Sequence, residues 1–74
     1  MSQWEKLIQK LKDNPTDVSF KTIKKILERY GFTITNIKGS HFKFSKEEDY
    51  IIIPTHNNKV KKYYIKQVIK SLNL

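Results

Sequence analysis

Three short runs of β-forming residues follow one another in the middle of this chain, with only tight connections between them. The runs are residues 32–37, 41–45 and 50–53. Gly39-Ser40 separates the first two runs, and a charged run at residues 46–49 separates the last two. Connections this short join neighbouring antiparallel strands. The segment is therefore predicted to form a three-stranded antiparallel sheet that the rest of the chain must cover.

The second and third runs differ in how their side chains alternate. Phe42 and Phe44 are predicted to face the core, whereas His41, Lys43 and Ser45 lie on the other face. The third run, residues 50–53, is apolar on both faces and ends before a proline. A bare apolar face invites association. The outer face of this strand is therefore expected to be covered by the first helix or by a partner.

Helical periodicity appears in three segments, two before the predicted sheet and one after it. Residues 2–12 have a capping box at Ser2 and Glu5, and residues 13–17 break the helix. Ser19 can cap a second helix that ends at Gly31, and residues 62–72 form the last helix. The apolar stripes of the three helices are Trp4, Leu7, Ile8 and Leu11; Phe20, Ile23, Ile26, Leu27 and Tyr30; and Ile65, Val68, Ile69 and Leu72.

The order of these elements predicts an α+β fold. A chain of 74 residues has room for one small core, so residues 1–74 are expected to form a single domain. Residues 1–17 would add an N-terminal helix and connection to a core at residues 18–74. Without that addition the order is α-β-β-β-α, which is the order of double-stranded RNA-binding domains, with both long helices on one face of the sheet.

The charge of the chain favours a polyanionic partner. Fifteen Lys and Arg residues outweigh seven Asp and Glu residues, which gives a net charge of +8. Arg29 is the only arginine, and lysine suits phosphates better than base edges, so contact with a nucleic-acid backbone is favoured over sequence reading. Lys59, Lys61 and Lys62 lie near the start of the last helix, where free amides also favour phosphate. A lysine-rich solvated surface remains the alternative.

Several classes of protein and site do not fit the sequence. The chain has no cysteine and no continuous apolar stretch typical of a signal peptide or membrane span, so a cytoplasmic protein without a membrane association is expected. The carboxylates form no obvious catalytic pair, and there is no phosphate-binding glycine loop. Two histidines are too few for a typical zinc site. Neither a metal nor another cofactor is therefore expected.

Imidazole chemistry is the catalysis that the sequence still allows. His41 and Lys43 would project from one strand face and supply a proton carrier and a cation side by side. Gly39 permits a close approach of substrate, and Ser40 could hold a phosphate oxygen. His56 could be a second proton carrier. Spacing alone favours an ordinary half-exposed strand histidine at position 41 and a loop hydrogen-bonder at position 56.

A resemblance to a known family sharpens this prediction. The segments that carry it are Lys38-Gly39-Ser40-His41-Phe42-Lys43-Phe44, Ile53-Pro54-Thr55-His56, Lys61-Lys62, the closing helix at residues 65–70 and the earlier helix at residues 19–27. Over residues 18–72 the chain resembles the HicA family of toxin ribonucleases. The resemblance implies a fold like that of a double-stranded RNA-binding domain, metal-independent cleavage of mRNA with His41 as catalytic residue, and inhibition by a HicB-type antitoxin.

Three functional hypotheses follow. The first is an endoribonuclease with His41 at its centre. Its expected RNA-binding residues are Lys38, Gly39, Ser40, Lys43, His56, Lys59, Lys61, Lys62 and Lys66. The second is a non-catalytic module that binds double-stranded or structured RNA through the same surface. The third is a protein-interaction domain, which explains the apolar outer strand but not the lysines. The helix at residues 2–12 extends beyond the shortest family members, and it could cover the sheet or contact the antitoxin.

Overall fold

The computed structural model describes residues 2–16 and 18–74, and it confirms the predicted α+β fold. Met1 and Asp17, which are the ends of the predicted N-terminal segment, lie outside the described residues. The elements are α1 (Gln3–Asp13), β1 (Val18–Ser19), α2 (Phe20–Arg29), β2 (Thr33–Lys38), β3 (His41–Lys46), β4 (Asp49–Pro54), β5 (Lys59–Val60) and α3 (Lys62–Ser71). The helices and the three longer strands lie within two residues of the predicted limits.

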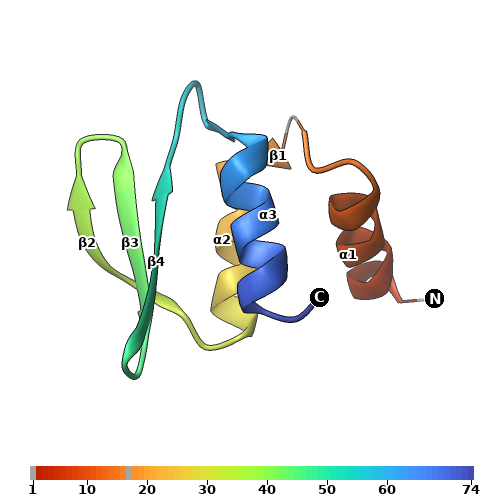
Figure 1. The fold of residues 1–74 in the computed structure, drawn as a ribbon, viewed down its shortest axis with the longest axis horizontal. Coiled ribbons are helices and arrows are strands. Elements are labelled where there is room, and N and C mark those ends of the chain that lie inside the picture. Colours follow the sequence, from red (N-terminus) through yellow and green to blue (C-terminus); the bar gives the residue numbers. More distant parts are fainter. Residues whose placement is uncertain (1, 17) are drawn as a thin grey trace.

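The three longer strands form an antiparallel sheet in the order β2-β3-β4 (Figure 1). Strand β3 is central, with His41 opposite Lys38 on one side and opposite Pro54 on the other. The predicted third strand stopped before Pro54, but the structure includes this proline in β4. Because β4 is an edge strand, a residue without an amide hydrogen is tolerated there.

Local hydrogen bonds explain where the helices begin. The hydroxyl of Ser2 accepts a hydrogen bond from the amide of Glu5 at 3.1 Å, which caps α1. The hydroxyl of Ser19 accepts one from the amide of Thr22 at 3.2 Å, which caps α2. Each bond satisfies an amide that has no partner inside its helix. After α2, Gly31 has φ +94°, as expected of the glycine that ends a helix.

Helices α2 and α3 cover one face of the sheet, and the core lies between them (Figure 1). Phe44 is fully buried there, and the ring of Phe42 lies 4.3 Å from the ring of Phe20, so the predicted inward face of β3 is confirmed. The buried core residues are Leu11, Ile23, Ile26, Leu27, Phe32, Phe44, Ile51, Ile53, Val60, Ile65 and Val68. No helix of the described residues lies on the opposite face of the sheet (Figure 1).

The N-terminal helix does not cover the sheet. Helix α1 lies against the helical layer, on the side remote from the three strands (Figure 1). Leu11 joins the core, and the Trp4 ring lies 6.1 Å from the Tyr30 ring and 4.5 Å from the Arg29 guanidinium carbon. The sheet-cover role considered for this helix is therefore wrong. The apolar stripe of α1 packs instead against α2 and the residues next to α2.

Two short strands were not predicted. Val18 and Ser19 of β1 pair with Val60 and Lys59 of β5 in a separate two-stranded sheet. The sequence between β4 and α3 was predicted as a loop, but β5 lies within it. This pairing holds the segment before α3 against the start of α2, where the amide of Phe20 also donates to the carbonyl of Asn58 at 2.8 Å.

Candidate active site

A groove of about 560 Å³ opens at one end of the large sheet, where β3 begins, β4 ends and α3 begins. Its lining residues are Ser40, His41, Pro54, Thr55, His56, Lys61 and Tyr64. Four of them, Ser40, His41, His56 and Lys61, are residues that the sequence predicted to act on RNA. The groove thus gathers both histidines of the chain and one lysine from three separate segments.

The turn between β2 and β3 places His41 at the groove. Gly39 has φ +61°, a left-handed conformation that glycine adopts without steric cost. The carbonyl of Ser40 accepts hydrogen bonds from the Thr55 amide at 2.9 Å and from the Thr55 hydroxyl at 3.3 Å. These bonds tie the start of β3 to the residue after β4. The side chain of His41 is exposed beside this connection.

A tight turn places His56 in the same groove. The amide of His56 donates to the carbonyl of Lys59 at 2.9 Å, and the amide of Lys59 donates back to the carbonyl of His56 at 2.9 Å. The two residues between them, Asn57 and Asn58, have φ +51° and +64°. Asparagine tolerates this left-handed conformation, and two such residues in succession are typical of a type I′ turn. The backbone of His56 is therefore fixed while its side chain is exposed.

The first turn of α3 supplies the positive side of the groove. Lys61 is the N-cap residue of α3, and its side chain makes no capping hydrogen bond. An uncapped helix start has free amides and the positive end of the helix dipole, both of which favour a phosphate. Lys61 is exposed and lines the groove. A negatively charged group between His41 and α3 would therefore meet an ammonium group and backbone donors.

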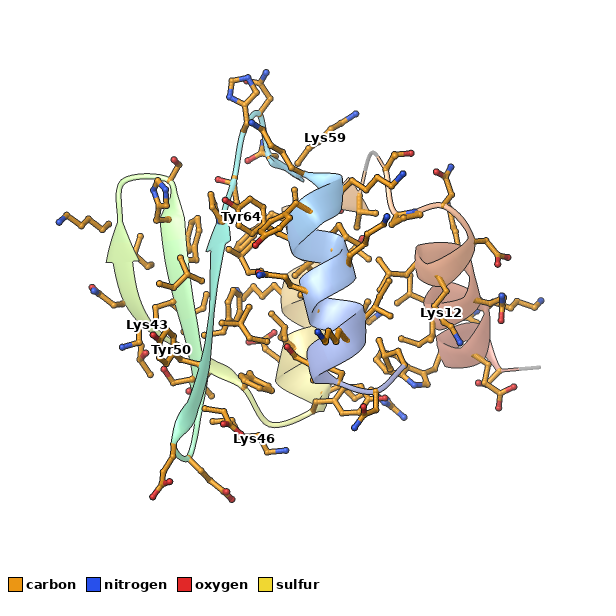
Figure 2. The ribbon with its side chains drawn as sticks, viewed as in Figure 1. Lys12, Lys43, Lys46, Tyr50, Lys59 and Tyr64 are labelled. Atoms are coloured by element: carbon orange, nitrogen blue, oxygen red, sulfur yellow. The ribbon has the colours of Figure 1, made fainter. Side chains whose placement is uncertain are left out.

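Lys43 does not lie beside His41 as the strand alternation suggested. Its ammonium nitrogen lies 4.8 Å from the centre of the Tyr50 ring (Figure 2). Tyr50 pairs with Ser45, whereas Pro54 at the other end of β4 pairs with His41. The Lys43 side chain thus extends along β3 away from His41. The predicted pairing of a proton carrier with this cation is wrong in this conformation.

The other predicted RNA-binding residues lie outside the lining of the groove. Lys38 is exposed directly across the ladder from His41, and Gly39 lies in the turn between them. The others are Lys59, Lys62 and Lys66, which are exposed on β5 and α3. They are placed to contact a long polyanion that continues past the groove, but not a group bound inside it.

Tyr64 is a groove residue outside the predicted RNA-binding set. It is half-buried and packed against the core. It also lines the groove and makes an edge contact with Tyr63 at 5.1 Å between ring centres. The signal that could have identified Tyr64 is its position as an aromatic residue three positions after Lys61, the N-cap residue of α3. A ring at this place can stack on a base.

Two further observations concern metals and membranes. Within residues 2–16 and 18–74, no three His, Cys, Asp or Glu side chains gather in a way that could hold a metal ion. None of the helices in the described parts of the chain is both long and apolar enough to cross a membrane.

Comparison with protein families identifies the relatives of this chain. Residues 20–74 match the family model described as the HicA toxin of bacterial toxin-antitoxin systems. The chain belongs to this family. The match begins at the first residue of α2 and includes every residue of the groove, whereas α1 and β1 precede it. Searches of curated proteins and of solved structures gave no match. Membership of the HicA family makes the chain a toxin with an antitoxin partner.

Proposed function

We propose that this HicA-family toxin is an endoribonuclease that cleaves mRNA without a metal ion, with His41 transferring protons at the scissile phosphate. The observation that carries the proposal is the groove in which His41 lies with His56 and Lys61. Family membership supports the toxin role, and the net charge of +8 supports an RNA substrate. Since mRNA is the substrate, the activity belongs in the cytoplasm.

The reaction that these residues suit is transfer of the RNA phosphate to its own ribose. The 2′-oxygen attacks phosphorus, the bond from phosphorus to the 5′-oxygen breaks, and a 2′,3′-cyclic phosphate and a 5′-hydroxyl result. One group must accept the proton of the 2′-hydroxyl and another must give a proton to the leaving oxygen. His41 fills one of these roles, and His56 is the available residue for the other.

The positive groups stabilise the charge that grows on the phosphate during this step. Lys61 lines the groove and the start of α3 has no side-chain cap, so the ammonium group and the first amides of the helix are available to bind a non-bridging oxygen. The backbone around Ser40 can bind a second oxygen. Lys38, Lys59, Lys62 and Lys66 would hold phosphates on either side of the cleaved bond, and Lys43 would contribute at longer range. Tyr64 would stack on a base next to the scissile phosphate.

The antitoxin of this pair is proposed to be a HicB-type protein that blocks the groove. A partner that presents carboxylates to the lysines would compete with RNA for the same charges. By covering His41 it would also exclude the ribose. A complex structure in which His41 stays open to bulk solvent would contradict this part of the proposal.

The test is an RNA cleavage assay in excess chelator. The wild-type protein is expected to shorten a defined mRNA and to leave 2′,3′-cyclic phosphate ends. His41→Ala is expected to reduce the rate by at least about 100-fold while its melting temperature changes little, because the side chain is exposed. Tight, salt-sensitive RNA binding without cleavage by the wild type would instead indicate a non-catalytic RNA-binding module. Cleavage only after addition of a divalent ion would refute the metal-free mechanism.

A second variant tests the role of His56. With two proton carriers the rate should rise and then fall with increasing pH. If His56 is one of them, His56→Ala should lower the rate by about 100-fold and remove one limb of this profile. The limb that disappears assigns the base and the acid: loss of the acidic limb makes His56 the base, and loss of the alkaline limb makes it the acid. An unchanged profile would leave His41 as the only catalytic histidine.

A further inference from the structure

The two edges of the large sheet are protected unequally. Strand β2 has two features that hinder the pairing of a further strand with its edge. Its register shifts at a bulge between Ile34 and Asn36, and it ends with Lys38. Strand β4 pairs with β3 in unbroken register over six residues and has no lysine. Its two exposed apolar side chains, Tyr50 and Ile52, are 61% and 45% exposed. An edge of this kind readily accepts another strand.

The backbone of β4 offers hydrogen-bonding groups on this free edge. The amide of Thr55 donates to the carbonyl of Ser40, so these two residues form a hydrogen-bonded pair next to the ladder. Bonded and non-bonded pairs alternate in an antiparallel ladder. Counting back from Thr55, Ile51 is bonded to β3, whereas the amides and carbonyls of Tyr50 and Ile52 point away from it. These groups are open to an added strand.

A groove runs beside this edge between β4 and α3. Its volume is about 390 Å³, and its lining residues are Tyr50, Ile51, Ile52, Gln67, Lys70 and Ser71. A smaller hollow of about 240 Å³ shares Tyr50, Ile51 and Ser71 with it. The α3 side of the groove is polar and carries Lys70, which is exposed. The β4 side is apolar. An occupant with carboxylates toward α3 and apolar side chains toward Ile52 would match both sides.

We propose that an acidic β-strand of the antitoxin pairs with β4 along this edge, as a contact separate from the one that covers His41. We choose the antitoxin as the occupant because membership of the HicA family implies such a partner. The exposed Lys70 beside this edge also favours an acidic occupant. A second copy of this chain is disfavoured, since each copy carries a net charge of +8 and two copies would repel each other. This inference rests on the antitoxin part of the proposed function.

Amide hydrogen exchange measured by NMR tests the pairing directly. The probe is the antitoxin encoded by the reading frame beside the toxin gene, added to the isotopically labelled full-length toxin. The amides of Tyr50 and Ile52 are expected to exchange freely in the toxin alone and at least about tenfold more slowly in the complex. The amides of Ile51 and Ile53 are the internal control, because they bond to β3 in both states.

A matched pair of variants tests the same surface by affinity. Ile52→Glu places a carboxylate where the acidic strand would lie and is expected to weaken antitoxin binding by at least about tenfold. Ile37→Glu changes a comparable exposed isoleucine on the other edge and should alter binding by less than about threefold. Neither residue belongs to the His41 groove, so RNA cleavage by both variants should match the wild type.

The outcomes separate the inference from the proposed function. A complex that protects His41 but leaves the amides of Tyr50 and Ile52 unprotected overturns the inference and leaves the proposed function standing. If the antitoxin does not bind at all, both its part of the proposed function and the inference fail, while RNA cleavage still reports on the nuclease. Concentration-dependent protection of Tyr50 and Ile52 in the toxin alone, with a doubled mass, would mean that a second copy occupies the edge and would also overturn the inference.

Discussion

The backbone amide and the hydroxyl of Thr55 both donate to the carbonyl of Ser40, at 2.9 and 3.3 Å. This double contact joins the residue before His41 to the residue before His56. The two histidines are 15 positions apart in the chain, and they reach one groove because the segments that carry them are fastened at this point. The spacing of the proposed proton carriers thus depends on a bond that neither of them makes.

The Thr55 hydroxyl is expected to matter more for cleavage than for folding. Thr55→Val removes one of the two hydrogen bonds and should lower the free energy of unfolding by about 0.5–1.5 kcal/mol. Cleavage should fall by about tenfold because a looser connection misplaces the reacting groups. Unfolding in denaturant and single-turnover cleavage measure the two effects.

Thr35→Val is the matched control. The Thr35 hydroxyl hydrogen-bonds to the Ser45 hydroxyl at 2.8 Å, on the sheet but outside the groove. Its loss should cost a similar amount of stability, about 0.5–1.5 kcal/mol, and leave cleavage at the wild-type rate. Equal losses of cleavage in the two variants would contradict a specific role for the bond between Thr55 and Ser40.

A comparison of Lys61 with Lys66 tests whether cleavage depends on positive charge in the groove or on positive charge elsewhere on the surface. Both lysines are exposed, but Lys61 is the N-cap residue of α3 and lines the groove, whereas Lys66 lies in the middle of the helix and does not. Lys61→Gln should lower kcat/KM by about 10- to 100-fold, since it removes a cation at the reacting phosphate. Lys66→Gln should act mainly on binding and reduce the salt dependence by about one phosphate contact. Similar effects of both substitutions on kcat would argue against the groove as the site of chemistry.

Helix α1 is expected to stabilise the protein without taking part in cleavage. Trp4 is half-buried against Tyr30 and Arg29, so Trp4→Ala should lower the free energy of unfolding by about 1–3 kcal/mol. The helix lies on the side of α2 and α3 remote from the sheet (Figure 1), so cleavage well below the melting temperature should be unchanged. Trp4→Phe should recover part of the lost stability. Loss of cleavage in a folded Trp4→Ala protein would place α1 in contact with RNA.

The fold was largely predictable because its main signals are local. The apolar stripe of residues 20–30 repeats with a helical period, and Phe42 and Phe44 alternate with polar residues, so element type and buried face followed directly. Strands β1 and β5 have only two residues each, and they exist because residues 18–19 meet residues 59–60. A pairing between segments so far apart leaves no periodic signal in either one.

The packing partner of α1 was not predictable for a related reason. The stripe of Trp4, Leu7, Ile8 and Leu11 says that one side of the helix is buried, but it does not say against what. The apolar outer face of β4 and the back of the helical layer were both available. In the structure α1 packs against the back of the helical layer, which leaves Tyr50 and Ile52 exposed.

The sequence predicted Ser40, His41, His56 and Lys61 of the groove, but not Pro54, Thr55 or Tyr64, and it predicted the geometry only in part. His41, His56 and Lys61 were each identified from the sequence, but that they share one groove follows from the bond between Ser40 and Thr55, which is long-range. Alternation along a strand assigned Lys43 to the face of His41. It could not give the side-chain rotamer, which directs the ammonium group elsewhere.

Substitution of Lys43 therefore tests whether its contact with Tyr50 persists when RNA binds. Its ammonium nitrogen lies over the Tyr50 ring at 4.8 Å, and an exposed contact of this type is worth about 0.5–1 kcal/mol. If that contact persists when RNA binds, Lys43→Met should reduce cleavage by less than about threefold, far less than Lys61→Gln. A phosphate near His41 could instead draw the ammonium group away, because charge-assisted hydrogen bonds are stronger than this contact. In that case Lys43→Met would match Lys61→Gln in its effect on kcat, and Tyr50→Leu, which releases the lysine, would leave cleavage undiminished.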